Sequence, residues 1–492
     1  MSRDAADIFH PPLLDVPAQA EIEVCDRLIG ARLFAAGHVA LLFGLAIVFT
    51  MCHVFVSAEF SVPIIFMLCA LVGAVISITL LESSSSERGY LIRVFVWTYS
   101  INVLLALASY YYYMSDHGTP FLATEQNPHD DAHFHRIGTN LAADWIQNTT
   151  KGEHLLANYT YKGYPWLLAG AYYFSSLWGD MSPIAPRIVN AMCGGLLVVA
   201  VFAVATLAYG KAVAIRASVL GAVFPTFWLY SGNTLRDIVI ALLVTVSVVM
   251  VMRLERTTIV LSRFLPMMGF VFSLSGVFFL RSLTFFALLS AFLLYFVMFA
   301  RGVALRIALG GAGIVLLTIG VFYGRDFGAP PAESLLGQAD HYTEMIVTGA
   351  SKESLAIQYI YSAPSYLFVP LNAIYTALAP IPPVKSFYLP HIIEGMGAVV
   401  WYFYLPFWVL GMYYGLKNRE SLLPVIVTIV LFLGIATIIA SARHKLQFQG
   451  LALVHVAEAS MRLTGKIAPI SAVVMLMLGG LAVTYIFLKM GG

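Results

Sequence analysis

Long apolar runs separated by short polar connections make up most of this chain. A run of roughly 17–25 apolar residues is long enough to cross a bilayer as a helix. Such runs lie at about 33–54, 60–81, 91–113, 185–208, 211–231, 236–254, 263–280, 283–301, 304–323, 391–415, 420–440 and 467–489, with a shorter one at 447–461. We therefore predict an all-α polytopic membrane protein with about 11–13 transmembrane helices.

Two further apolar segments, residues 162–179 and 364–380, are short and interrupted, and we expect both to lie at the outer surface without crossing. With the N-terminus inside, this arrangement places most Lys and Arg residues of the short connections in the cytosol, as the positive-inside rule requires. These residues are Lys211, Arg216, Arg253, Arg256, Arg301, Arg306, Lys417, Arg419, Arg462 and Lys466.

The predicted organisation is a cytosolic tail at residues 1–32 and a single transmembrane domain at 33–492. External loops at 114–184 and 324–390 interrupt this domain. We expect interfacial helices in the first loop, and the second could cover a site as a lid.

Composition narrows the class of protein further. The 492 residues are 60% hydrophobic and only 11% charged, whereas a soluble protein carries about 25% charged residues. A net charge of +2 gives no reason to expect a nucleic-acid partner. The four cysteines are scattered, which predicts no disulfide framework. The acidic N-terminal stretch lacks the apolar core of a signal peptide.

The stretch from His129 to His135 packs two carboxylates and three imidazoles into the first external loop. An apolar stripe at helical spacing starts within it and predicts a helix lying along the membrane surface. The stripe consists of Phe134, Ile137, Leu141 and Trp145. The opposite side of the helix consists of His133, Arg136, Asn140 and Asp144. Asp130 and Asp131 come at the N-terminal end, where the helix dipole favours carboxylates.

Three readings of this acidic pair stay open. A carboxylate at a helix N-terminus can simply cap it. Asp130, Asp131 and His133 are also candidate ligands of a divalent metal ion, although His133 and His135 would point apart on a helix. The third reading is catalysis, with the imidazoles of His133 and His135 hydrogen-bonding a substrate.

Positive charges that break the positive-inside pattern fall on the same outer side as the acidic pair. They are Arg236, Arg281 and the Arg443-His444-Lys445 run. Together they indicate an anionic ligand there. The simpler alternative is that Arg236 pairs with Asp237 and that Arg281 extends to the membrane surface.

An acidic group, external cations and an apolar groove are what a glycosyl transfer from a lipid-linked sugar requires. The acid deprotonates the attacking hydroxyl, and the cations hold the phosphate leaving group. Nucleotide sugars are cytosolic, so an external site implies a lipid-phosphate carrier. Lys162 and Tyr164 could also meet the donor phosphate, or could anchor the segment at the membrane surface.

Four features resemble the GT-C superfamily of polyprenyl-phosphate-sugar glycosyltransferases, and within it the family 39-like protein O-mannosyltransferases and aminoarabinose transferases. They are Asp130-Asp131 with the helix that follows, Lys162–Ala169 with Ala185–Ala191, Phe224-Pro225 with Leu235-Arg236-Asp237, and Ala442–Lys445. The resemblance covers roughly residues 125–300 and the late basic run.

The resemblance implies an inverting transfer of sugar to a glycan, lipid or protein acceptor, in the cell-envelope polysaccharide pathways of a bacterial inner membrane. It puts the catalytic base on Asp131 or Asp130, and we favour Asp131 because Asp130 is nearer the turn at Pro128. A divalent metal ion is used by some members of the superfamily and not by others. This chain departs from the family in having two extra apolar segments before the acidic loop.

Two other functions compete with this one. A polysaccharide polymerase or ligase would rely on external Arg and His residues of the second loop, which holds Arg325 and His341. A lipid or solute transporter would carry charged residues near the bilayer midplane and internal repeats, and the sequence shows neither.

Overall fold

The computed structural model describes residues 32–80, 85–122, 130–157, 162–179, 181–299 except 258 and 260, 364–379, 388–436 and 442–463, with residues 360, 469 and 480 as isolated positions. Every regular element in these ranges is helical, and they contain no strand. Eight helices are long and apolar enough to cross a membrane. The protein is therefore an all-α, multi-pass integral membrane protein, as the apolar runs predict.

These eight helices reproduce the expected spans closely. They are α2 (Ala36–Ser57), α3 (Ser61–Thr79), α4 (Ser85–His117), α8 (Ala185–Tyr209), α11 (Asp237–Arg256), α13 (Ser282–Phe299), α18 (Leu389–Leu416), and α19 (Leu422–Ala436) with the short 3-10 helix η5 (Arg419–Ser421) before it. The shorter runs form α12 (Phe264–Leu280), preceded by η3 (Leu261–Arg263), and α20 (Leu446–Arg462), preceded by η6 (Ala442–Lys445). The predicted span at 304–323 and the loop at 324–363 lie outside the described residues apart from residue 360, as does nearly all of 467–489.

One predicted span is wrong as a single helix. Residues 211–231 form two helices, α9 (Lys211–Ala222) and α10 (Pro225–Ser231), which meet at 58°. Phe224, between them, is extended with φ −79° and ψ 112°. The cause is local, because a residue before proline is pushed out of the helical region.

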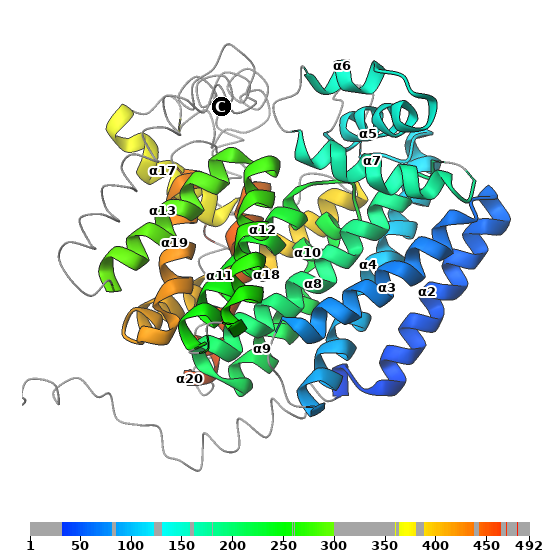
Figure 1. The fold of residues 1–492 in the computed structure, drawn as a ribbon. Coiled ribbons are helices and arrows are strands. Elements are labelled where there is room, and N and C mark those ends of the chain that lie inside the picture. The colour runs from blue at the N-terminus through cyan, green and yellow to red at the C-terminus, as the bar shows by residue number, and fades with distance from the viewer. Residues whose placement is uncertain are drawn as a thin grey trace, which may run out of the picture.

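Helix α8 lies at the centre of the bundle and packs against α3, α4, α9, α11 and α20 (Figure 1). Within its apolar window 89% of the residues are buried, compared with 28% for α2 at the margin of the bundle. Since lipid replaces water around such a bundle, exposed apolar side chains on α2 and α3 face the membrane without penalty.

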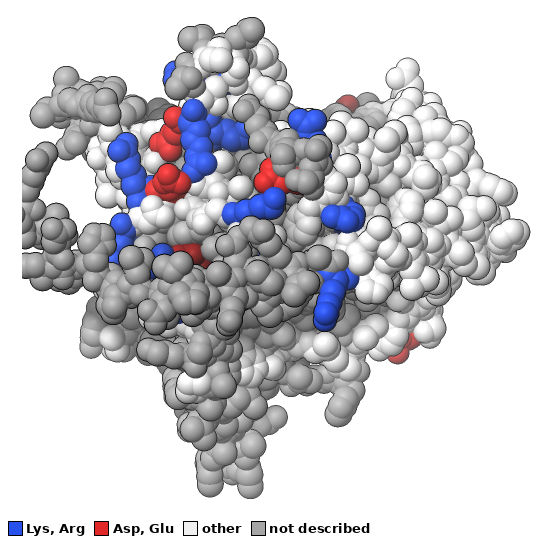
Figure 2. Space-filling model, turned by 90° about the horizontal axis from the view of Figure 1, so that it is seen from below, with Lys and Arg blue, Asp and Glu red and all other residues white. Residues whose placement is uncertain are grey.

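Basic connections gather at one end of the bundle. Lys211 lies 3.3 Å from Glu87, and Arg256 lies 2.7 Å from Glu420. Arg253 donates to the carbonyl of Thr79 at the same end. Figure 2, viewed from below, shows blue side chains outnumbering red ones on this face.

The opposite end carries three helices from residues 114–184, α5 (Asp130–Gln147), α6 (Lys151–Ala157) and α7 (Gly163–Ser176), at the top of Figure 1. Helix α7 lies across this end, because Gly163 packs on the carbonyl of Phe279 in α12 while Ser175 bonds Ser61 in α3. The other short segment forms α17 (Ser365–Leu378), whose Asn372 donates to the carbonyl of Ala436 at the end of α19.

Candidate active site

Helix α5 binds the bundle through the apolar stripe expected from its sequence. Phe134, Ile137 and Leu141 are buried on α7 and its neighbours. Trp145 differs, since it is 38% exposed and packs its ring 5.2 Å from that of Trp166. The stripe therefore fixes the first three turns of α5, and with them the acidic pair at its start.

Asp144 does not lie on the polar side of α5, as its spacing suggested. It is buried, and its Oδ2 accepts hydrogen bonds from the backbone N–H groups of Gly152 (2.6 Å) and Glu153 (3.1 Å) at the start of α6. Burial by itself would raise the pKa of this carboxyl, but these bonds and one from the Thr149 hydroxyl lower it. Asp144 thus caps α6, which no periodicity within α5 could have revealed.

The two adjacent carboxylates of the acidic pair have different environments. Asp131 is fully buried, and its two oxygens accept from the backbone N–H groups of Leu122 (2.8 Å) and Ala132 (2.9 Å). The side chain of Asp130 is 37% exposed, and its Oδ2 lies 2.6 Å from a guanidinium nitrogen of Arg443. Asp131 therefore anchors the start of α5, while Asp130 is accessible and faces a cation from the far end of the chain.

The candidate metal ligands Asp130, Asp131 and His133 do not gather. Across the residues that the structure describes, no group of three His, Cys, Asp or Glu side chains could hold a metal ion. Asp130 meets an arginine, and the Nδ1 of His133 lies 3.4 Å from a nitrogen of Arg136. Arginine side chains therefore border this stretch at Asp130 and at His133.

The imidazoles after the acidic pair separate, as a helix requires. Half-buried His135 bonds the hydroxyl of Tyr172 at 2.6 Å, and burial followed by the charge of Arg187 lowers its pKa to about 4. Burial and the nearby Arg136 also lower the pKa of His133, against the effect of Asp130. Both rings are therefore neutral near pH 7.

Two residues expected to meet the donor lie at the start of α7. Lys162 is half-buried just before the helix begins. Tyr164 is fully buried, and its hydroxyl accepts from the side-chain amide of Asn190 at 2.9 Å. Tyr164 is thus part of the packed interior and does not face outward as a membrane anchor would.

Cations predicted from separate segments meet beside the acidic pair. Arg281, in the tight connection between α12 and α13, is buried and lies 3.5 Å from Asp237. It also bonds the Nε2 of His444. Arg236 donates to the carbonyl of Leu280 at 3.4 Å and lies over the ring of Phe134 at 5.7 Å.

These contacts correct both parts of the simpler alternative for Arg236 and Arg281. Arg281, and not Arg236, is the cation bonded to Asp237. Arg281 is also turned inward, since only 4% of its surface is exposed. Neither arginine therefore behaves as an isolated side chain at the membrane surface.

The η6 segment brings the late basic run to the same place. Burial and the charges of Arg281, Arg443 and Arg236 hold the pKa of His444 well below its usual value, so its Nε2 accepts a bond from Arg281. Burial would lower the pKa of Arg443, but Asp130 and Asp237 raise it. Three arginines thus surround one neutral histidine, with two aspartates among them.

Lys445 lies a little apart from these arginines. Its Nζ bonds the carbonyl of Ala379 at the end of α17 and lies 5.7 Å from the ring of Trp401. Burial lowers the pKa of this amine to about 7, and Glu394 on α18 works in the opposite direction. Lys445 can therefore gain or lose its charge near neutral pH.

Sequence reasoning gave no separate role to two buried residues of α8. The guanidinium of Arg187 donates to the carbonyl of Ala106 and the hydroxyl of Ser109, each at 3.4 Å, and to the carbonyl of Pro120. The side-chain nitrogen of Asn190, which carries two N–H groups, lies within hydrogen-bond distance of two backbone carbonyls and of the Tyr164 hydroxyl. The available signal was polarity, because an arginine and an asparagine three residues apart at the start of a membrane span are costly unless they are used.

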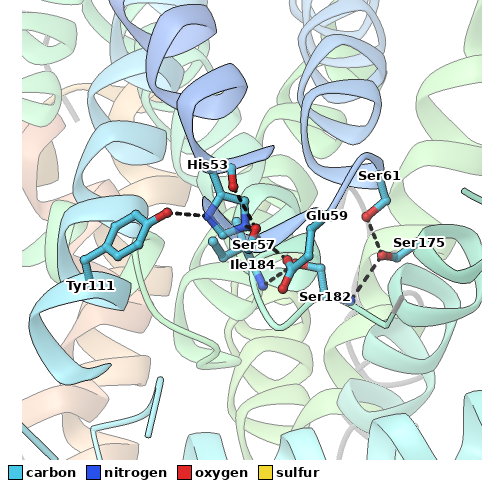
Figure 3. A network of polar contacts seen from close by, with 8 residues as sticks. All are labelled: His53, Ser57, Glu59, Ser61, Tyr111, Ser175, Ser182 and Ile184. Carbon is cyan, nitrogen blue, oxygen red and sulfur yellow. Dashed lines mark hydrogen bonds and ion pairs between the residues drawn. The ribbon is translucent and has the colours of Figure 1, made fainter. Parts of the chain in front are cut away.

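A second polar network lies at the same end, where α2 turns into α3 (Figure 3). His53 bonds the hydroxyl of Tyr111 through Nδ1 (2.7 Å), and its Nε2 faces both Glu59 (3.1 Å) and Ser57 (2.9 Å). A catalytic Ser–His–carboxylate triad needs its hydroxyl and carboxylate on opposite ring nitrogens. Here both are on Nε2, so the network joins helices and does not activate the serine.

Comparison with known proteins gives similarity in structure alone. No protein-family model matches the chain, and no curated protein sequence does. The apo oligosaccharyltransferase of Archaeoglobus fulgidus aligns over 77% of this chain and 51% of its own, with 14% identity and a TM-score of 0.44.

The same archaeal enzyme, AglB, in complex with an inhibitory peptide and a dolichol-phosphate aligns over 79% of this chain and 52% of its own, with 13% identity and a TM-score of 0.45. Its complex with Zn and sulfate gives 14% identity and a TM-score of 0.44, over 78% of this chain and 51% of its own. This chain spans about half the length of these structures.

Proposed function

We propose that this protein is a membrane glycosyltransferase that moves a sugar from a polyprenyl-phosphate carrier to a hydroxyl of a glycan, lipid or protein acceptor. The reaction takes place at the end of the bundle that carries α5, which we assign to the periplasmic or external side. The observation that carries the proposal is the pairing of Asp130 with Arg443, which lies around His444 together with Arg236 and Arg281 from two other segments of the chain.

Arginines suit the donor end of this reaction because their planar groups bind phosphate oxygens in pairs. Arg236, Arg281 and Arg443 lie together, and the two aspartates among them leave the group with a formal positive charge. As the bond between the anomeric carbon and the phosphate oxygen breaks, negative charge grows on that oxygen. Fixed cations stabilise it more strongly here than in water.

An exposed apolar surface that could hold the carrier tail ends beside these arginines. Helix α12 ends next to Arg281, and one of its faces is exposed along its length. This face contains Leu265, Met268, Phe272 and Phe279. A polyprenyl chain lying along α12 would place its phosphate at the arginines.

The base in this proposal is Asp130. The sequence-based preference for Asp131 gives way because Asp131 is fully buried and both its oxygens accept backbone bonds. Asp130 is accessible, and a donor phosphate that binds Arg443 would compete with it for that cation. The carboxylate then accepts the proton of the acceptor hydroxyl, whose oxygen attacks the anomeric carbon from the face opposite the departing phosphate. Configuration is inverted, and polyprenyl phosphate leaves with the bonding electron pair.

The test is transfer from a radiolabelled polyprenyl-phosphate sugar, comparing wild type with Asp130→Asn and Asp131→Asn. Asp130→Asn should abolish transfer while leaving thermal stability and polyprenyl-phosphate binding intact. Asp131→Asn should lower stability and retain measurable transfer. Normal transfer by Asp130→Asn would refute the assignment of Asp130 as the base. Normal transfer by both variants would show that neither aspartate takes part in the reaction.

A further inference from the structure

Arg187 and Asn190 lie on one face of the first turns of α8, and both are fully buried. Each uses its side chain to bond backbone carbonyls of segments that approach the site. Arg187 reaches Pro120, close to the Leu122 N–H that Asp131 accepts from. Asn190 reaches Asn233 and Leu235, directly before Arg236 and Asp237.

The contacts of Asn190 explain how the second of these segments keeps its shape. Its Nδ2 lies 2.7 Å from the carbonyl oxygen of Asn233 and 2.9 Å from that of Leu235. Both carbonyls belong to a buried turn between α10 and α11, where water is scarce and backbone groups need protein partners. The amide of Asn190 therefore supplies a protein partner for two carbonyls of this turn, while the Ser109 hydroxyl donates to a third, that of Gly232.

A small shift of the turn would reach the cations at once. Arg236 and Asp237 are the next two residues along the chain, and both are buried. The bond from Arg236 to the carbonyl of Leu280 requires the backbone of Arg236 to stay where it is. The bond between Asp237 and Arg281 requires the same of the backbone of Asp237. The orientation of two of the three arginines is thus tied to the turn.

We propose that Asn190 is a positioning residue for the phosphate-binding half of the site, acting through the turn at residues 233–235 on Arg236 and Asp237. This inference rests on the proposed function. Asn190 touches no reacting atom. Its effect should therefore fall on donor binding and leave acceptor binding unchanged.

Asn102 provides a matched control. It is also a fully buried amide that donates to a backbone carbonyl, but its acceptor is Ala191 in α8, at 3.4 Å, and not the turn at residues 233–235. Both Asn190→Ala and Asn102→Ala should lower thermal stability, Asn190→Ala more so because Asn190 has three contacts at 2.7–2.9 Å and Asn102 has one at 3.4 Å. A purely structural role for Asn190 would make the two variants alike in every other respect.

The kinetic experiment measures KM for donor and acceptor in both variants and in Arg236→Ala. Asn190→Ala should raise the donor KM about tenfold, roughly the effect of one charge-assisted hydrogen bond. The acceptor KM should stay unchanged, and Asn102→Ala should change neither constant. In the Arg236→Ala background, adding Asn190→Ala should raise the donor KM by a smaller factor than in wild type, because only the route through Asp237 to Arg281 remains. An equal rise in both constants, or a full effect in that background, would overturn the proposal.

Hydrogen–deuterium exchange separates this inference from the proposed function. Amide groups of residues 231–237 should exchange faster in Asn190→Ala than in wild type or Asn102→Ala. If wild type neither binds polyprenyl phosphate nor transfers sugar, the proposed function fails, and the exchange result still decides whether Asn190 holds the turn. Equal exchange in the two variants would show that it does not.

Discussion

Two polar networks occupy the same end of the bundle, and their charges differ. Around His444, three arginines face two aspartates, and these residues come from α5, the start of α11, the α12–α13 connection and η6. Where α2 meets α3, one histidine faces one glutamate six residues away, with Ser57 and Tyr111 completing the bonds.

This difference distinguishes a ligand-binding site from a polar contact that only connects helices. A contact of the second kind needs only enough partners to satisfy each buried polar group, and the His53 network does so with mostly local residues. Excess charge of one sign in a buried cluster costs energy unless an oppositely charged ligand offsets it, and here three arginines exceed two aspartates by one charge. We therefore place function at the arginine cluster and structure at the His53 network.

The largest expected effect is on chemistry. Asp130→Asn should lower the rate of transfer at least about a hundredfold, the usual contribution of a general base. Glu59→Gln, which changes a carboxylate of the other network in the same way, should leave the rate within about twofold of wild type, because Glu59 touches no substrate in this account. Rates measured with saturating donor and acceptor would separate the two. A comparable loss in both variants would abolish the distinction between the networks.

The next effect concerns the buried pair Arg281–Asp237. Arg281→Met should destabilise the protein by about 3 kcal/mol, because buried Asp237 would lose the cation that is hydrogen-bonded to it. The double variant Arg281→Met with Asp237→Leu should recover most of that stability. Donor affinity should not return in the double variant, since the phosphate would still lack Arg281. Thermal melting and donor KM, measured on the same preparations, would show whether the double variant regains stability without regaining donor binding.

A pH profile tests Lys445. Its pKa is lowered to about 7, so the amine is charged below that pH and loses its charge above it. If it attracts the donor phosphate, the donor KM should rise between pH 6 and pH 8. Lys445→Met should have a higher donor KM and a flat profile over the same range. A slope that persists in Lys445→Met would assign the titration to another group.

The smallest effect is expected in the second network. His53→Gln should cost about 1 kcal/mol of stability, the net value of a hydrogen bond or two lost between α2 and α4. The donor and acceptor KM values should not change. A donor KM that rises in this variant would mean that the His53 network also belongs to the site.

The sequence was informative where a feature is local or periodic. Apolar runs predicted the membrane helices, and the spacing of Phe134, Ile137 and Leu141 predicted the buried face of α5. Charges that violate the positive-inside pattern pointed to Arg236, Arg281 and the Arg443–Lys445 run, which the structure brings to one end of the bundle. Their roles toward a substrate remain predictions.

The sequence was uninformative where a partner comes from far along the chain. Asp130 and Asp131 are neighbours with the same chemistry, and their contacts with Arg443 and with the N–H of Leu122, from elsewhere in the chain, distinguish them. Asn190 is bonded to carbonyls more than forty positions away. The break at Phe224 was missed although its signal is local, because Pro225 disfavours a helical residue before it.

The most direct test of the central claim is whether the arginine cluster binds a lipid phosphate. Binding of polyprenyl phosphate and of the matching uncharged polyprenol would be compared for wild type and for the Arg281→Met, Asp237→Leu double variant. Wild type should bind the phosphate at least about tenfold more tightly than the alcohol. The double variant should lose this preference. Equal binding of phosphate and alcohol by wild type would contradict the claim.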